Sequence, residues 1–150
     1  MDIKKPLLLI GALVALSEAV ATAKDEEPED FTEVSGGAYE SADNHHLVYF
    51  IGEAKNENTA EDFVADYDVT SMETELGFDY RGERERVKID DCRVFNYQFF
   101  IYPAYVFACH RDEHVILIVG TEYPVLNDVA EQFHEDEDIK LPREYKEVED

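Results

Sequence analysis

The histidines of this chain are the residues with the most specific chemistry. His110 and His114 flank a short polar turn, and two imidazoles opposed across a hairpin can chelate a metal ion. Zinc would need a further protein ligand, which Asp112 or the His45–His46 pair could supply. The same pattern is also typical of exposed histidines at strand ends, so both interpretations stay open.

Carboxylates offer a second metal chemistry, because hard cations such as calcium prefer oxygen ligands. The string Asp66-Tyr67-Asp68 resembles a set of loop ligands, but the EF-hand pattern with its central glycine and terminal glutamate is missing. We therefore expect weak association of calcium or another divalent cation with surface carboxylates, and no dedicated cofactor.

Cys92 and Cys109 are the only two cysteines, and an exported chain can join them in a disulfide. A tight hairpin centred on Pro103 would place Cys109 opposite a residue near Asn96 instead of Cys92. A disulfide requires Cα atoms within about 7 Å, so this register needs a bend or bulge before Asn96. We expect the disulfide, and two free buried thiols are the alternative.

Basic residues gather in one stretch of an otherwise acidic chain. Arg84, Arg86 and Lys88 fall on one face of a strand, because side chains alternate with a period of two. Such a stripe suits the docking of an acidic partner or of the chain's own acidic tail. Charge on an edge strand also prevents sheet-to-sheet aggregation, which is the competing interpretation.

Catalytic motifs are missing from the sequence, which has no G-x-S-x-G and no H-E-x-x-H pattern. Gly52 and Gly120 each follow an apolar run, but neither belongs to a glycine-rich phosphate loop. Cys109 and His110 are neighbours on a strand, so they point to opposite faces and His110 does not activate Cys109. We therefore expect a non-enzymatic protein.

Hydrophobic periodicity predicts the elements that position these residues. Apolar or alternating runs predict strands at 46–51, 78–89, 94–102, 104–110 and 114–119. Apolar residues at i, i+3, i+4 and i+7 predict one helix capped by Thr59 and a second beginning near Pro124. This β-α-β-β-β-β-α order predicts an α+β fold, an antiparallel sheet of about four to five strands with two amphipathic helices covering one face.

The strand at 104–110 is apolar on both faces, so we expect it and its neighbour to be central and covered on both sides. Helices on one face leave the other to be covered by the N-terminal segment, by a curled sheet or by a partner chain. A protein partner and self-association are both consistent with this pattern.

The N-terminus has the form of a secretory signal peptide over residues 1–23. Lys4 and Lys5 precede the apolar run 6–16, and Ala21-Thr22-Ala23 matches an A-x-A cleavage site. The run is shorter than the roughly 20 apolar residues of a transmembrane helix, so we expect no integral membrane span after cleavage. We therefore predict a secreted or extracytoplasmic protein, and an uncleaved N-terminal anchor is the alternative.

Composition divides the rest of the chain into three parts. Residues 24–37 are strongly acidic, have little apolar content and end in Ser35-Gly36-Gly37, which predicts a disordered linker. A single α+β domain is expected over 38–134, and an acidic C-terminal tail over 135–150.

The formal net charge of −23 excludes nucleic acid as a partner, because contacts with phosphates require a basic surface. Removal of residues 1–23 takes away two acids and two bases, so the exported protein keeps this charge. The acidity is typical of proteins adapted to molar salt, and a local role as a cation-binding tail is the alternative.

Adaptation to salt predicts that the free energy of unfolding rises markedly between low and molar salt. The Debye length is about 3 Å at molar salt, so repulsion among surface carboxylates is largely screened there. Denaturant titrations of the exported protein at both salt concentrations measure the effect, and a midpoint that does not move contradicts the adaptation.

The sequence as a whole predicts an exported, non-enzymatic binding or structural module that acts at or outside the cell surface. The alternative is a secreted divalent-cation-binding protein that uses surface carboxylates or the His110/His114 pair.

Overall fold

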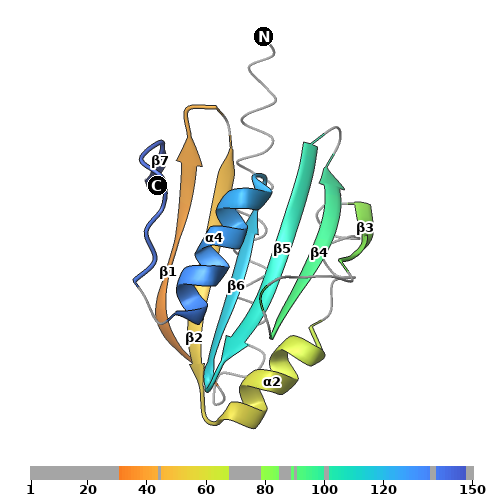
Figure 1. Ribbon diagram of the computed structural model, residues 1–150, viewed down its shortest axis with the longest axis vertical. Helices are drawn as coiled ribbons and strands as arrows, with labels where there is room; N and C mark the ends of the chain where they lie inside the picture. The colour runs from red at the N-terminus through yellow and green to blue at the C-terminus, as the bar shows by residue number, and fades with distance from the viewer. Residues whose placement is uncertain are drawn as a thin grey trace.

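A computed structural model describes residues 31–43, 45–67, 79–84, 89, 91–99, 102–135 and 138–147. The strands are β1 (Phe31–Ser41), β2 (His46–Ala54), β3 (Asp79–Glu83), β4 (Cys92–Phe99), β5 (Tyr102–Arg111), β6 (His114–Gly120) and β7 (Tyr145–Glu147), and the helices are α2 (Glu57–Ala65) and α4 (Tyr123–His134). The seven strands form one antiparallel sheet in the order β3-β4-β5-β6-β2-β1-β7 (Figure 1).

The fold is α+β as predicted, but the predicted number and order of strands were wrong. β1 begins at Phe31, so residues 31–37 of the predicted linker lie in a strand. β7 lies within the predicted acidic tail and pairs with β1. β1 is interrupted by Gly36-Gly37 and polar residues, and β7 has only three residues, so neither carries the apolar run that marks a strand. The predicted signal peptide, residues 1–23, lies outside the described residues.

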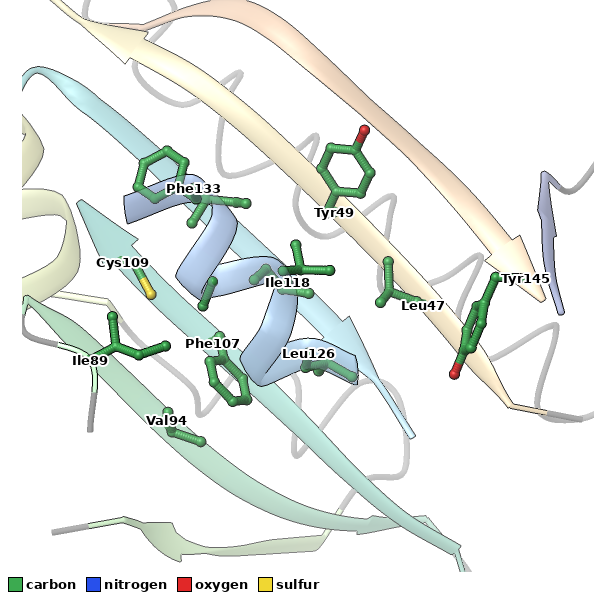
Figure 2. Close-up of a cluster of buried hydrophobic side chains, with 13 residues drawn as sticks. Leu47, Tyr49, Ile89, Val94, Phe107, Cys109, Ile118, Leu126, Phe133 and Tyr145 are labelled. Atoms are coloured by element: carbon green, nitrogen blue, oxygen red, sulfur yellow. The ribbon is translucent and has the colours of Figure 1, made fainter. Parts of the chain in front are cut away.

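The two helices lie on opposite faces of the sheet, which corrects the prediction that both cover one face. Side chains of α4 pack with Phe107, Cys109 and Ile118, and we call this side of the sheet the α4 face (Figure 2). Val64 of α2 packs with the alternate residues of the same strands, including Val106, and we call this side the α2 face. An amphipathic stripe shows that a helix needs an apolar surface, but it does not specify which face.

The α4 face is covered along its centre by the buried residues of α4. Gly120 permits this packing, because a Cβ atom there would lie 2.6 Å from the carbonyl oxygen of His46 and 2.8 Å from Leu126. Ile139, Leu141 and Tyr145 extend the same cluster beyond the helix. The glycine predicted not to bind phosphate therefore has a packing role.

Helix α2 begins before the predicted Thr59 cap. The side chain of Asn56 accepts a hydrogen bond from the backbone N–H of Thr59 at 2.8 Å, so Asn56 is the N-cap. Ala60 of the helix packs against Ala54 and Val115. The helix therefore begins on the part of the α2 face where β2 ends and β6 starts.

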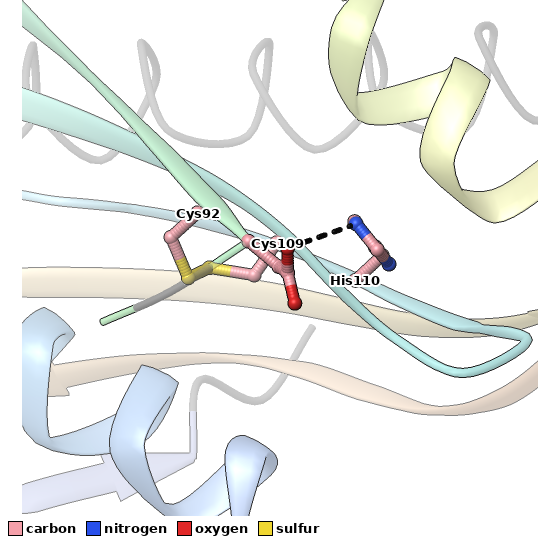
Figure 3. Close-up of a disulfide and its surroundings, with 4 residues drawn as sticks. Cys92, Cys109 and His110 are labelled. Carbon is pink, nitrogen blue, oxygen red and sulfur yellow. Dashed lines mark ion pairs between the residues drawn. A yellow bond between two sulfur atoms is a disulfide. The ribbon is translucent and has the colours of Figure 1, made fainter.

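The β4–β5 register places Cys92 directly opposite Cys109, and the predicted disulfide is present (Figure 3). The two Cα atoms are 4.1 Å apart, as suits a directly opposed pair. The hairpin centred on Pro103 was wrong, because Phe99 pairs with Tyr102 and Pro103 lies inside β5 opposite Gln98. No bend or bulge is therefore needed to join the cysteines.

Candidate functional site

The strand register separates the predicted metal-binding histidines. Arg111 lies opposite His114 and His110 lies opposite Val115, so the two imidazoles leave opposite faces of the sheet. The Nε2 atom of His110 lies 3.7 Å from Asp91 (Figure 3). The Nε2 atom of His114 lies 3.9 Å from the carboxylate of Glu53. The predicted pair does not form a common site.

The other predicted metal ligands also lie apart. His45 and His46 are at the start of β2, whereas His114 pairs with Glu53 near the end of that strand. Asp112 is exposed in the turn with a φ of 53°. Asp66 is the C-cap of α2, and Asp68 lies outside the described part of the chain. The described residues contain no group of three or more His, Cys, Asp or Glu that could hold a metal ion.

Of the predicted docking stripe, Arg84 is described, and Arg86 and Lys88 lie outside the described residues. The guanidinium carbon of Arg84 lies 4.0 Å from the ring centroid of Tyr123, and its Nε donates to Asn96 at 3.2 Å. Arg84 therefore joins the β3–β4 edge to the start of α4, and docking of a partner on the stripe stays a prediction.

Arg93, from the same basic region, holds the C-terminus of α2. Its Nη1 donates to the carbonyl oxygens of Val64 at 2.9 Å and Ala65 at 2.8 Å. Its Nε donates to Glu83 at 2.7 Å, and this hydrogen bond is the main cause that raises the pKa of Arg93. A cation at this position stabilises the helix end, where unpaired carbonyl groups gather.

Replacing Arg93 with alanine is expected to lower the free energy of unfolding by about 1–2 kcal/mol, because charged hydrogen bonds to the helix end are lost. Arg93→Lys is the matched control: it keeps the charge but cannot donate to both carbonyls and to Glu83 in one planar fork. Urea denaturation measures both variants. An alanine variant as stable as the wild type would contradict this role.

A polar cluster that sequence reasoning missed joins the start of β2 to the start of α4. The Nδ1 of His45 lies 3.3 Å from the hydroxyl of Thr121, and its Nε2 lies 3.9 Å from Glu122. The phenol of Tyr145 donates to Glu122 at 2.8 Å, and burial and this bond raise the pKa of Tyr145. The backbone N–H of His46 also donates to the Thr121 hydroxyl.

The order hydroxyl, imidazole, carboxylate resembles a catalytic triad, but the geometry does not activate Thr121. The hydroxyl is buried and accepts the His46 N–H, and the 3.9 Å gap between His45 and Glu122 exceeds a hydrogen bond. The cluster ties the C-terminal strand β7 to the sheet, which is a structural role. Its members are far apart in the sequence, so no local motif marks it.

His46 is the buried titratable residue nearest to this cluster. It is 3% exposed, and its Nε2 has no hydrogen-bond partner. Burial, helped by the neighbouring His45, lowers the pKa of His46 from 6.5 to about 4. Between about pH 4 and pH 6.5, the imidazole therefore stays neutral in the folded protein but is protonated in the unfolded chain.

His46 should make the protein less stable as the pH falls from about 6.5 to about 4. The unfolded chain takes up a proton on His46 in this window and the folded protein does not, because the folded pKa is about 4. The loss is about 3 kcal/mol at most. His46→Leu has no imidazole to protonate. In urea titrations between about pH 6.5 and pH 4, the free energy of unfolding should therefore fall more for the wild type than for the variant. Parallel pH profiles would contradict the assignment.

Four strands build an apolar surface on the α2 face. Val48 lies opposite Val119, Val119 opposite Val106, and Val106 opposite Phe95. One step farther along the strands, Ala104 lies opposite Tyr97. We call this area the distal α2 face, and it consists of Val48, Tyr97, Ala104, Val106 and Val119.

Helix α2 lies at the other end of this sheet face, across the ends of the strands (Figure 1). Its contacts lie at that end: Ala60 packs against Ala54 and Val115, and the last carbonyl oxygens of the helix accept hydrogen bonds from Arg93. Tyr67, just beyond the helix, reaches Phe95 with ring centroids 5.8 Å apart. The described members of the apolar cluster on the α2 face come from the sheet, from α2 and from Tyr67.

Period-two alternation in 104–110 predicted apolar side chains on both faces of this strand, and Ala104 and Val106 contribute theirs to the distal α2 face. Within the described ranges, no helix is long and apolar enough to cross a membrane. No protein-family model, curated protein or solved structure matches this chain.

Proposed function

We propose that this chain is an exported, non-enzymatic module that binds an apolar segment of another protein on the distal α2 face. The observation that carries the proposal is the row Val48–Val119–Val106, which crosses three central strands on the α2 face. Contiguous apolar surfaces are typical of interaction sites where they become accessible to a partner.

Export is supported by two features. The N-terminal pattern of Lys4-Lys5, an apolar run and an A-x-A site is typical of a signal peptide. The Cys92–Cys109 disulfide suits an oxidising compartment, where such crosslinks persist.

The charge of the protein favours a different partner over a second copy. Two copies that each carry a formal charge of −23 repel one another, and this repulsion opposes self-association at low ionic strength. A partner whose apolar segment is flanked by basic residues would gain from both the apolar contact and the charge. We therefore propose an apolar or amphipathic helix with basic flanks as the ligand class.

Titration of the exported protein with fluorophore-labelled amphipathic peptides tests the proposal. The protein is recovered from the extracytoplasmic fraction of a host, and N-terminal sequencing establishes that it begins at Lys24. Saturable binding is expected to a peptide with lysine flanks, and weaker binding to the same peptide with glutamate flanks.

Two matched variants locate the site. Val48→Asp places a charge on the distal α2 face and should weaken binding at least about tenfold, because a buried charge opposes apolar contact. Val34→Asp makes the same change at an exposed position of β1 and should leave affinity unchanged. Circular dichroism verifies that both variants fold. Absence of binding, or equal affinity of the two variants, would contradict the proposed function.

A further inference from the structure

We infer that the outer edge of β1 over residues 31–38 binds an extended basic segment of another protein, which joins the sheet as a further strand. A strand added in this way gains affinity from main-chain hydrogen bonds and specificity from its alternate side chains. The inference goes beyond the proposed function, because it concerns a different surface and a ligand in a different conformation.

Strand pairing leaves this edge of β1 open. β1 pairs with β2 from Phe31 to Glu40, whereas β7 pairs on the other side with Tyr39, Glu40 and Ser41 only. β7 accordingly lies beside one end of β1 (Figure 1). Among the described residues, no strand pairs with the rest of this outer edge, which is roughly 25 Å long. Such an edge presents main-chain N–H and C=O groups to a further strand.

Solvent exposure shows that water reaches this edge in the full chain. Gly36 is exposed, and since glycine has no side chain, its exposed surface belongs to the main chain. Val34 is 54% exposed, and it is the one large hydrophobic side chain that lies exposed in the described part of the protein. An added strand would cover both the accessible main chain and this valine.

Val34 lies in a β-bulge of this edge. The β1–β2 register shifts between Glu33 and Ser35, so Val34 has no direct partner on β2. Bulges re-aim a side chain and interrupt regular pairing, which protects an edge from indiscriminate association. The regular part of the open edge is therefore 35–38, adjacent to the residues that pair with β7, and Val34 lies at its end.

The segment that connects α4 to β7 is a competing cover for this edge, but its contacts are with α4. The backbone N–H of Lys140 donates to the side chain of Gln132 at 2.8 Å, and the Lys140 carbonyl oxygen accepts from the same side chain at 3.0 Å. Ile139 and Leu141 pack in the cluster on the α4 face. Within the described ranges, no backbone hydrogen bond joins this segment to 31–38. The edge therefore stays available to a partner.

The charge of the edge favours a basic partner over a second copy. β1 contains Glu33 and Glu40 and no basic residue, and Glu53 of β2 lies opposite Thr32. Pairing of two β1 edges would bring these carboxylates together in two copies that each carry a formal charge of −23, and like charges on paired strands are destabilising. A segment in which lysine alternates with valine would instead oppose the acids and offer apolar contact to Val34.

Titration of the full chain with a fluorophore-labelled peptide of alternating valine and lysine tests the inference. The protein is made by cell-free synthesis, and saturable binding is expected. Hydrogen exchange followed by mass spectrometry should slow at least about tenfold for the outward-facing amides of 31–38, because they gain hydrogen bonds. The same peptide with N-methyl groups on its central backbone nitrogens keeps its side chains but cannot donate main-chain hydrogen bonds, so its affinity should fall at least about tenfold.

Two matched variants locate the binding edge. Val34→Lys replaces the apolar contact with a like charge and should weaken binding of the valine–lysine peptide at least about fivefold. Glu131→Gln changes the net charge by the same amount at an exposed position of α4 and should bind as the wild type does. Circular dichroism verifies that both variants fold. Equal affinity of the two variants would overturn the inference.

Three further results would overturn it: no saturable binding, equal affinity for the N-methylated peptide, or slower exchange confined to strands other than β1. Slow exchange of every amide in 31–38 before the peptide is added would do the same, because the edge would then already be paired within the chain or with a second copy. The titration with amphipathic peptides separates the two proposals. Loss of that binding alone overturns the proposed function, and loss of binding to the extended peptide alone overturns the role of the β1 edge.

Discussion

Replacing Phe107 with alanine is expected to lower the free energy of unfolding by about 3–5 kcal/mol, the usual cost of removing a fully buried aromatic ring. Phe107 is 0% exposed and lies on the α4 face between Val94 and Ile118 in the strand register (Figure 2). Its ring lies 5.3 Å from that of Tyr123, at the start of α4. Its removal leaves a cavity between the sheet and the helix. Urea denaturation followed by circular dichroism measures the loss.

Two controls make this result specific. Phe107→Leu keeps most of the apolar volume and is expected to cost much less than the alanine variant. Val34→Ala, at a side chain that is 54% exposed, should change the free energy of unfolding by less than about 0.5 kcal/mol. A loss below about 1 kcal/mol for Phe107→Ala would show that α4 does not pack on the sheet as described.

Loss of the Cys92–Cys109 disulfide should be the second large effect. The bond joins residues 17 positions apart, and in the chain-entropy model a loop of this size stabilises the fold by about 3 kcal/mol. The bond restricts the unfolded chain, and the β4–β5 pairing that brings the cysteines together uses backbone hydrogen bonds that survive reduction. The double variant Cys92→Ala, Cys109→Ala should therefore fold but unfold at a lower urea concentration.

Reduction provides the control for this prediction. A thiol reductant should destabilise the wild type by a similar amount and should leave the double variant unchanged. Equal stability of the oxidised and reduced wild type would mean that the crosslink does not hold the fold. A double variant that responds to reductant would show that the reductant acts by another route.

The sequence predicted the centre of the fold well, because local pattern and burial agree there. The predicted apolar run forms β6, which is almost entirely buried. The apolar residues at helical spacing form the buried side of α4. The two faces of β5 were also assigned correctly, since alternation alone determines them. Pairing of Cys92 with Cys109 was predicted from composition and compartment.

The features that the sequence did not predict depend on pairing between strands that are far apart in the chain. β1 and β7 have weak strand patterns and gain their conformation from β2 and from one another. The hairpin register depends on the residue at which the chain turns, and Pro103 was a misleading marker because it is accommodated inside β5. This one shift decided whether Cys109 lies opposite Cys92.

The positions of the candidate site residues also depend on long-range strand pairing. His110 and His114 are close in sequence, but a single step of register sends them to opposite faces. The distal α2 face gathers Val48, Val106 and Val119 from three strands, so only the sheet order brings them together. The sequence predicted that one face would lack a helix, and this was wrong, because the structure places a helix on each face.

Methyl NMR of the exported protein with a saturating apolar peptide shows whether the distal α2 face binds the peptide. Each valine methyl reports on one face, and the valines of both faces serve as internal references. The methyl signals of Val48, Val106 and Val119 should shift on binding, and those of Val94 and Val129 on the α4 face should not. Shifts confined to Val94 and Val129, or no shifts with a bound peptide, would contradict the assignment of the distal α2 face as the binding surface.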